Sequence, residues 1–227
     1  MIKIIKNFFN KNVFYRIISG IFFVIPFVYS IISGGIFFVL FFILILIMII
    51  YEFNESSRNK IQLSLRCLII LLFIISFFHF IFLRIAYDGF IIEYLLYIIF
   101  TIWIFDSFSL IGGRIIGGRK LMPLISPNKT ISGLISGFLS IFLFSLLLII
   151  FYNKNLEIIL ISLFIGFISF IGDAIESYFK RFLDIKDFSN LIPGHGGFLD
   201  RMDAFLLIFL THLILSLIVI SPINYYV

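Results

Sequence analysis

Seven long apolar runs constrain the fold of this 227-residue chain more than any other feature of its sequence. A helix needs about 20 mostly apolar residues to cross a bilayer. Only helices and closed barrels satisfy their backbone polar groups in lipid. The runs lie at residues 17–33, 35–51, 66–83, 90–105, 131–152, 156–172 and 204–220. They predict an all-α, polytopic integral membrane protein with about seven transmembrane helices, within a range of about six to nine.

Composition excludes the main alternative classes of protein. The chain is 62% hydrophobic and 13% charged, whereas soluble domains are about half apolar and about a quarter charged. A soluble core cannot absorb this excess, because most residues of a small domain lie near its surface. The single cysteine, Cys67, excludes a disulfide scaffold, and the hydrophobicity excludes a disordered chain.

The distribution of basic residues predicts the orientation in the membrane. If the amino terminus is cytoplasmic, 15 of the 17 lysines and arginines fall in cytoplasmic segments, which leaves only Arg84 and Lys154 outside. This asymmetry is the positive-inside pattern. We therefore interpret the net charge of +5 as contact with anionic headgroups, with no nucleic acid as partner. Glu52 ends the second run, and we expect it among the headgroups.

Polar residues are concentrated in two predicted cytoplasmic stretches, 106–133 and 173–203. We therefore divide the chain into amino-terminal transmembrane helices, 1–105, and a catalytic transmembrane region, 106–227, which carries both stretches. The active site is expected to face the cytoplasm.

The first stretch combines glycine pairs with basic side chains. Glycines let a backbone approach a ligand closely, and cations neutralise phosphates. Ser126 or Thr130 can begin the next helix and leave its positive end open to an anion. A flexible basic loop is the competing interpretation, and this stretch alone favours it.

The second stretch places its polar side chains on one helical face, at spacings of three and four residues. These residues are Asp173, Glu176, Ser177, Lys180, Arg181 and Asp184. An amphipathic interfacial helix with internal ion pairs is the competing interpretation. Acidic groups at the end of a membrane helix are costly unless they are solvated or bind a ligand, which favours a site.

A glycine-rich loop at 193–197 then precedes Asp200 and Asp203, which are one helical turn apart. Carboxylates with few histidines and no cysteine nearby suit a hard cation such as Mg²⁺. Glycines, cations and carboxylates together indicate phosphoryl or nucleotidyl transfer, in which positioning and charge neutralisation supply most of the catalysis.

The spacing of these residues resembles the signature of the phosphatidate cytidylyltransferases, also called CDP-diacylglycerol synthases. The resembling run is Ser177-x2-Lys180-Arg181-x4-Lys186-Asp187-x5-Pro193-Gly194-His195-Gly196-Gly197-x2-Asp200-Arg201-x-Asp203. Upstream, the resemblance includes Asp106, Gly113-Arg114, Gly117 and Ser126-Pro127-x-Lys129-Thr130. The motifs cover about 106–203, and elsewhere the likeness is one of hydropathy.

The resemblance implies that CTP and phosphatidic acid react to CDP-diacylglycerol and pyrophosphate. It implies a Mg²⁺ cofactor, with K⁺ as an optional second ion, and metal ligands among Asp173, Asp200 and Asp203. The implied catalytic residues are Asp173, Lys180, Arg181, Asp200 and Arg201. The implied substrate-binding residues are Asp106, Arg114, Ser126, Lys129, Thr130, Ser177, Lys186, Asp187, His195, Gly196 and Gly197.

Two positions depart from the family pattern, and several alternatives stay open. Ser132 stands where the family carries a glutamate, and Asn128 stands where a second lysine is common. A CTP-dependent lipid kinase of the dolichol kinase type shares much of the carboxy-terminal pattern; a transporter or an inactive scaffold is a more distant alternative. The aspartate spacing of Asp200 and Asp203 argues against a CDP-alcohol phosphotransferase. The resemblance implies a bacterial cytoplasmic membrane and is compatible with a homodimer.

Overall fold

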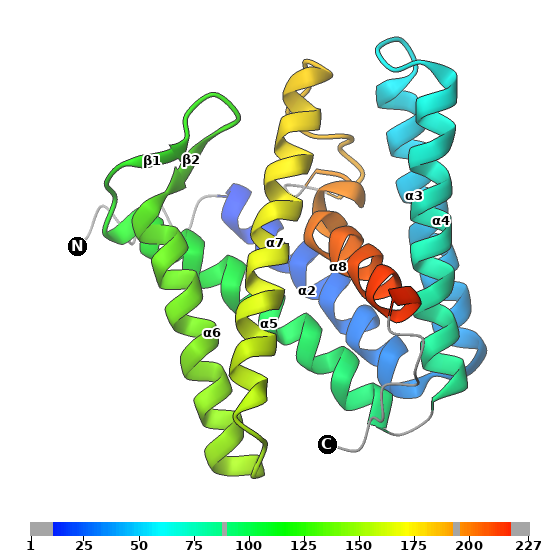
Figure 1. Ribbon diagram of the computed structural model, residues 1–227. Coiled ribbons are helices and arrows are strands. Elements are labelled where there is room, and N and C mark those ends of the chain that lie inside the picture. Colours follow the sequence, from blue (N-terminus) through cyan, green and yellow to red (C-terminus); the bar gives the residue numbers. More distant parts are fainter. Residues whose placement is uncertain (1–10, 88–89, 193–195, 219–227) are drawn as a thin grey trace. The chain divides into compact units, whose positions relative to one another are not determined.

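The structure is a computed structural model that describes residues 11–87, 90–192 and 196–218 (Figure 1). Its elements, in chain order, are α2 (Lys11–Ser33), α3 (Gly35–Ser57), α4 (Leu63–Ala86), α5 (Phe90–Ile115), β1 (Lys120–Met122), β2 (Ser126–Thr130), α6 (Ile131–Tyr152), α7 (Glu157–Phe182) and α8 (Leu199–Ile218). Each of the seven predicted apolar runs coincides with, or largely overlaps, one of these helices.

Within the described ranges, five helices are long and apolar enough to cross a membrane, namely α3, α4, α5, α6 and α7. The apolar part of α2 that the structure describes, Phe22–Ser33, is shorter. Many of the large apolar side chains on these helices are exposed, as expected for surfaces in contact with lipid tails. The chain is therefore an all-α, multi-pass membrane protein.

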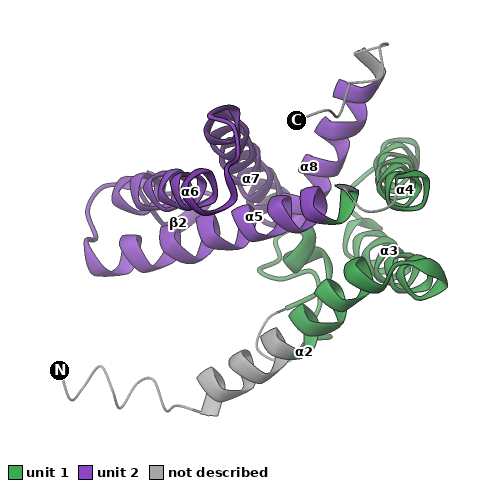
Figure 2. Cartoon of the chain, turned by 90° about the horizontal axis from the view of Figure 1, so that it is seen from below, with its two compact units in different colours: residues 1–92, 182–202 green, residues 93–181, 203–227 purple. Residues whose placement is uncertain are grey.

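The chain forms two compact units, coloured separately in Figure 2. Unit 1 contains residues 1–92 and 182–202, and unit 2 contains residues 93–181 and 203–227. Helix α8 begins in unit 1 and continues in unit 2. The division at residue 105, which separates amino-terminal helices from a catalytic region, stays a prediction.

Unit 1 packs α2, α3 and α4 around a cluster of phenylalanines. Phe27, Phe38, Phe42 and Phe77 are fully buried, and the rings of Phe38 and Phe42 lie 4.6 Å apart. The turn between α2 and α3 uses Gly34, which has φ of 62°. Only glycine adopts this backbone region without steric cost, so Gly34 lets α2 and α3 follow one another through a tight turn.

Unit 2 packs α5 against α6 through small residues. A Cβ atom added at Gly137 of α6 would lie 2.9 Å from the ring of Phe105 and would also collide with the Ser109 hydroxyl. One at Gly133 would lie 3.2 Å from the Cα atom of Gly113. Small residues allow close helix contact, and in lipid van der Waals packing is a main driving force for helix association.

A short β-hairpin connects α5 to α6, which is a departure from the purely helical prediction. Strand β1 pairs antiparallel with β2, with Lys120 opposite Thr130. Gly117 and Gly118, both with positive φ, turn the chain after α5. Ser126 lies in β2 and does not begin a helix. Thr130 is the N-cap of α6, where its Oγ1 accepts a hydrogen bond from the Gly133 N–H at 3.1 Å. Of the two predicted starts of this helix, Thr130 is therefore the correct one.

Candidate functional site

Residues from both polar stretches meet in unit 2. The Lys129 ammonium, carried by β2, lies 2.5 Å from Asp173 Oδ2 on α7. It also lies 5.2 Å from the centroid of the Phe170 ring. The aromatic ring and the carboxylate both favour a cation at this position. The Asp173 side chain is 35% exposed, so a ligand from solvent can reach it.

Asp106 joins this group from α5. Its Oδ1 accepts a hydrogen bond from the Ser169 hydroxyl at 3.3 Å. The charges of Asp203, Asp173 and Lys129 lie close enough to act on its carboxyl group. Unit 2 thus gathers three predicted aspartates and one predicted lysine in one electrostatic environment. We call Asp106, Lys129, Asp173 and Asp203 the aspartate cluster.

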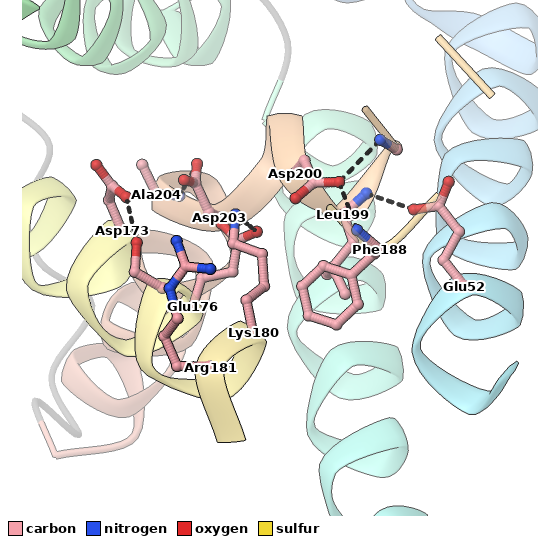
Figure 3. Close-up of polar contacts among 12 residues, drawn as sticks. Glu52, Asp173, Glu176, Lys180, Arg181, Phe188, Leu199, Asp200, Asp203 and Ala204 are labelled. Atoms are coloured by element: carbon pink, nitrogen blue, oxygen red, sulfur yellow. Dashed lines mark hydrogen bonds and ion pairs between the residues drawn. The ribbon is translucent and has the colours of Figure 1, made fainter. Parts of the chain in front are cut away.

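The last turns of α7 extend the aspartate cluster along one helical face (Figure 3). The Ser177 hydroxyl donates to Asp173 Oδ1 at 3.2 Å. One turn further along, Lys180 Nζ lies 2.8 Å from Glu176 Oε1. The Glu176 carboxyl group also lies close to that of Asp203 of α8. The predicted polar face therefore exists from Asp173 to Lys180, and its side chains hold one another in place.

Glu176 was placed on this face by its spacing but was not predicted as a site residue. Its side chain is only 8% exposed, and buried carboxylates require a partner because desolvation is costly. The sequence did contain a signal for Glu176: it lies one helical turn after Asp173, on the same polar face of the helix.

Arg181 fixes the hairpin. Its Nε donates to the carbonyl oxygen of Ile125, between β1 and β2, at 3.1 Å. Asp184, expected on the same helical face, lies beyond the end of α7 with φ of 56°. Its carboxylate pairs with Lys60 at 2.5 Å. Asp184 is therefore a surface residue outside the aspartate cluster, and the Lys60 ammonium lowers the pKa of its carboxyl group.

Gly172 explains how α8 approaches α7 within unit 2. A Cβ atom there would lie 3.0 Å from the carbonyl oxygen of Asp203 and 3.2 Å from the Cα atom of Ala204. Any larger residue would therefore push the two helices apart at the level of the aspartate cluster.

Asp200 belongs to unit 1, where it holds backbone groups on either side of residues 193–195. Its Oδ2 accepts hydrogen bonds from the backbone N–H groups of Phe188, at 2.9 Å, and Gly197, at 2.8 Å. Gly196 adopts φ of 81°, and its carbonyl oxygen accepts from the Ile192 N–H at 2.8 Å. One oxygen of the predicted metal ligand is therefore engaged in shaping the loop.

Glu52 was not predicted to contribute to this region, and its expected place among the headgroups is wrong. Its side chain is buried, with 1% exposure. Its Oε1 accepts from the Ser189 hydroxyl at 2.6 Å and from the Phe198 N–H at 3.0 Å. Its Oε2 accepts from the Leu199 N–H at 2.8 Å (Figure 3). No local pattern in the sequence links a glutamate in α3 to a loop so distant along the chain.

These contacts change how the glycine-rich loop is interpreted. The N–H groups of Gly197, Phe198 and Leu199 are donated to Asp200 and Glu52. The start of α8 is thus already capped by carboxylates and does not offer these N–H groups to a phosphate.

The remaining predicted residues are placed as follows. Arg114 is exposed near the end of α5, and Ser126 lies in β2. Lys186, Asp187 and Arg201 belong to unit 1. His195 lies outside the described residues. Ser132 occupies the position of the family's glutamate, where its hydroxyl donates to the Gly117 carbonyl oxygen and contacts Thr130 Oγ1 at 3.0 Å.

The carboxylates of the aspartate cluster suit a hard cation. Among the described residues, no group of three or more Asp, Glu, His or Cys side chains is arranged to hold a metal. Mg²⁺ is commonly held by one or two carboxylates together with substrate phosphates and water. Oxygen donors without competing nitrogen or sulfur ligands fit that mode of binding.

Comparisons with known proteins give one consistent result. A family model described as "Cytidylyltransferase family" matches residues 4–219. The chain is 35% identical over 207 residues to the phosphatidate cytidylyltransferase of Rickettsia bellii, which covers 87% of this chain and 88% of that protein. For the Rickettsia prowazekii protein of the same name, the identity is 36% over the same length. The phosphatidate cytidylyltransferase of Staphylococcus haemolyticus is 39% identical over 124 residues. This match covers 53% of this chain and 47% of that protein.

Proposed function

Because the chain belongs to the cytidylyltransferase family, we propose that it transfers cytidylate from CTP to phosphatidic acid. The products are CDP-diacylglycerol and pyrophosphate, and the role is phospholipid biosynthesis. The observation that carries this proposal is the contact between Lys129 and Asp173. It joins the two motif-bearing stretches in one site, where carboxylates suit a Mg²⁺ ion and a lysine suits a phosphate of the nucleotide.

The reaction requires little acid–base chemistry from the protein. A phosphate oxygen of phosphatidate attacks the α-phosphorus of CTP, and a new P–O bond forms. The bond between the α-phosphorus and the bridging oxygen breaks, and pyrophosphate leaves with that electron pair. A phosphate monoester is already mostly ionised at pH 7, so the nucleophile needs no strong general base.

The main task of the protein is to position two anions and to offset their charge. Lys129 and Lys180 lie beside the polar face of α7. Each forms an ion pair with a carboxylate of that helix, Lys129 with Asp173 and Lys180 with Glu176. Arg181 links this face to the hairpin. Ser177 orients the carboxylate of Asp173. Roles for Arg114, Lys186, Asp187, His195 and Arg201 in binding stay predictions.

Asp173 and Asp203 are the residues that we propose to hold Mg²⁺, with Asp106 close enough to act on both electrostatically. When bound, Mg²⁺ neutralises phosphate charge and polarises the α-phosphorus. K⁺ is proposed as a second ion. Asp200 stays a third candidate ligand. Its Oδ2 accepts two backbone N–H groups, as Asp203 Oδ1 accepts the Ala204 N–H at 2.7 Å.

We further propose seven transmembrane helices, α2 to α8, with the amino terminus and the aspartate cluster on the cytoplasmic side of a bacterial inner membrane. The positive-inside distribution of lysines and arginines supports this orientation. CTP, which is water-soluble, then reaches the site from the cytoplasm, and phosphatidate reaches it from the inner leaflet.

The decisive experiment uses purified protein in detergent with Mg²⁺, phosphatidate and CTP labelled at the α- or the γ-phosphorus. Appearance of α-label in lipid, with release of pyrophosphate, is the expected result. Absence of α-label from lipid, with γ-label entering lipid when a polyprenol replaces phosphatidate, would identify a lipid kinase. Transfer of neither label by a folded sample would favour a non-catalytic protein.

A further inference from the structure

We propose that Glu52 is a positioning residue for cytidylyl transfer, an inference that rests on the proposed function. It lies in α3, outside the motif-bearing region 106–203, and no part of the signature includes it. Its carboxylate holds the segment that joins the glycine-rich loop to α8, and through that segment it sets where α8 begins.

The geometry assigns Glu52 a supporting role and not a direct one. Both carboxylate oxygens accept hydrogen bonds, and the side chain is 1% exposed. A group this enclosed cannot also contact CTP or phosphatidate. Hydrogen bonds to an ionised acceptor are stronger than neutral ones, so one buried carboxylate can hold Ser189, Phe198 and Leu199 together.

Glu52 and Asp200 both accept backbone N–H groups at the start of α8, at neighbouring positions from 197 to 199. Asp200 Oδ2 takes the N–H groups of Phe188 and Gly197, and Glu52 takes the next two N–H groups, those of Phe198 and Leu199. A Cβ atom at Gly197 would collide with the Glu52 carboxylate. The loop therefore has a glycine where this carboxylate passes closest to the backbone.

The consequence for catalysis follows from the continuity of α8. This helix carries Asp200 and Asp203 in its first two turns. Small displacements of reacting groups cost large factors in rate. A loosened helix start should therefore lower the rate of the chemical step more than it weakens the binding of either substrate.

The test compares Glu52→Gln, Glu52→Asp and Ser189→Ala in the full-length protein. Glutamine keeps the size of the side chain but offers one acceptor oxygen and an NH₂ group that cannot accept from backbone N–H groups. We expect Glu52→Gln to lower kcat at least tenfold, with KM for CTP and for phosphatidate within about threefold of the original values. Glu52→Asp should restore part of kcat, because it keeps the charge.

A matched control is Ser57→Ala, which removes another buried polar group of α3. The Ser57 hydroxyl donates only within its own helix, to the Phe53 carbonyl oxygen at 2.6 Å. The kcat of Ser57→Ala should stay within about twofold of the value for the unmodified protein. Hydrogen–deuterium exchange should be faster in peptides covering 188–199 of Glu52→Gln, and unchanged in peptides from α4.

The outcomes separate this inference from the proposed function. If the unmodified protein transfers α-label and Glu52→Gln does so with unchanged kcat, the positioning role is wrong and the function stands. A rise in KM with kcat unchanged would also overturn it. If Glu52→Gln does not elute as a folded protein, Ser189→Ala decides: a two- to threefold fall in kcat supports the proposal, and no change refutes it.

Discussion

At the scale of single residues, the charged side chains of the aspartate cluster and of the adjacent turn of α7 neutralise one another in pairs. Lys129 faces Asp173, and Lys180 faces Glu176. Partly buried charges of this kind are tolerated only with partners at close range. Removing one member therefore leaves its partner uncompensated, as well as deleting its own proposed contribution to catalysis.

Asp173→Asn should reduce cytidylyl transfer at least a hundredfold, because it removes a proposed Mg²⁺ ligand and the partner of Lys129. Asparagine has nearly the same shape, so the protein should still elute as a folded species. Rates are measured with α-labelled CTP. Asp184→Asn is the control, since that carboxylate pairs with Lys60 on the surface. Near-normal turnover of Asp173→Asn would remove Asp173 from the proposed site.

Asp200→Asn should differ from Asp173→Asn in its effect on stability. The substitution weakens two hydrogen bonds from loop N–H groups to a carboxylate, each worth roughly 1.5–3 kcal/mol when the acceptor is charged. We expect turnover to be abolished and the melting temperature in detergent to fall by several degrees. A melting temperature equal to that of Asp173→Asn would argue that the loop does not depend on Asp200.

The sequence predicted all four residues of the aspartate cluster but not the contacts among them. Lys129 and Asp173 came from motif spacing, and the contact between them needs the tertiary fold. Glu52 was missed because its three donors belong to a segment far away along the chain, and a glutamate at the end of an apolar run normally indicates a headgroup contact. Long-range hydrogen bonds leave no local periodicity to detect.

At the scale of elements, the contact between α5 and α6 depends on glycines and serines. These residues let the two helices approach until backbone atoms touch. In lipid there is little hydrophobic gain from bringing helices together, so the fit of the surfaces carries much of the association.

Gly137→Leu should therefore destabilise unit 2. Even a Cβ atom at this position would be too close to Phe105 and Ser109, and overpacking of this kind typically costs about 1–3 kcal/mol. The matched control is Leu139→Ala, which removes an exposed apolar side chain from the same helix. Thermal unfolding in detergent should show a clear loss for Gly137→Leu and a small one for the control. Equal melting temperatures would contradict the close contact.

The sequence predicted the positions of the helices well, because apolar runs of this length have few alternatives in a membrane. It did not predict the hairpin. β1 has three residues and β2 has five, and β2 contains Pro127 and Asn128, which are unfavourable in strands. Its position is instead supported by tertiary contacts, from Arg181 to Ile125 and from Lys129 to Asp173.

At the scale of the whole molecule, charge asymmetry is the property that sets the orientation. Basic residues are concentrated in alternate connections between the apolar runs, and such a bias determines which segments stay in the cytoplasm. Lys60, between α3 and α4, and Lys154, between α6 and α7, are on opposite sides in the proposed topology.

Cysteine labelling tests this orientation directly. After Cys67→Ser, we expect Lys154→Cys to react with a membrane-impermeant maleimide added to intact spheroplasts. Lys60→Cys should react only after the membrane is permeabilised. Activity of both variants provides the control for folding. Reaction of both positions from the same side would require a different number of spans between them.

The hydrogen bonds of Glu52 have a consequence for how genes of this kind can recombine. A fragment that carries every signature residue would still lack the carboxylate that holds the start of α8. Chimaeras that join the first 105 residues of one relative to the remainder of another should therefore work only when the donor of the first part brings a matching acid in α3. We therefore expect the signature region to function only together with a helix that lies outside it.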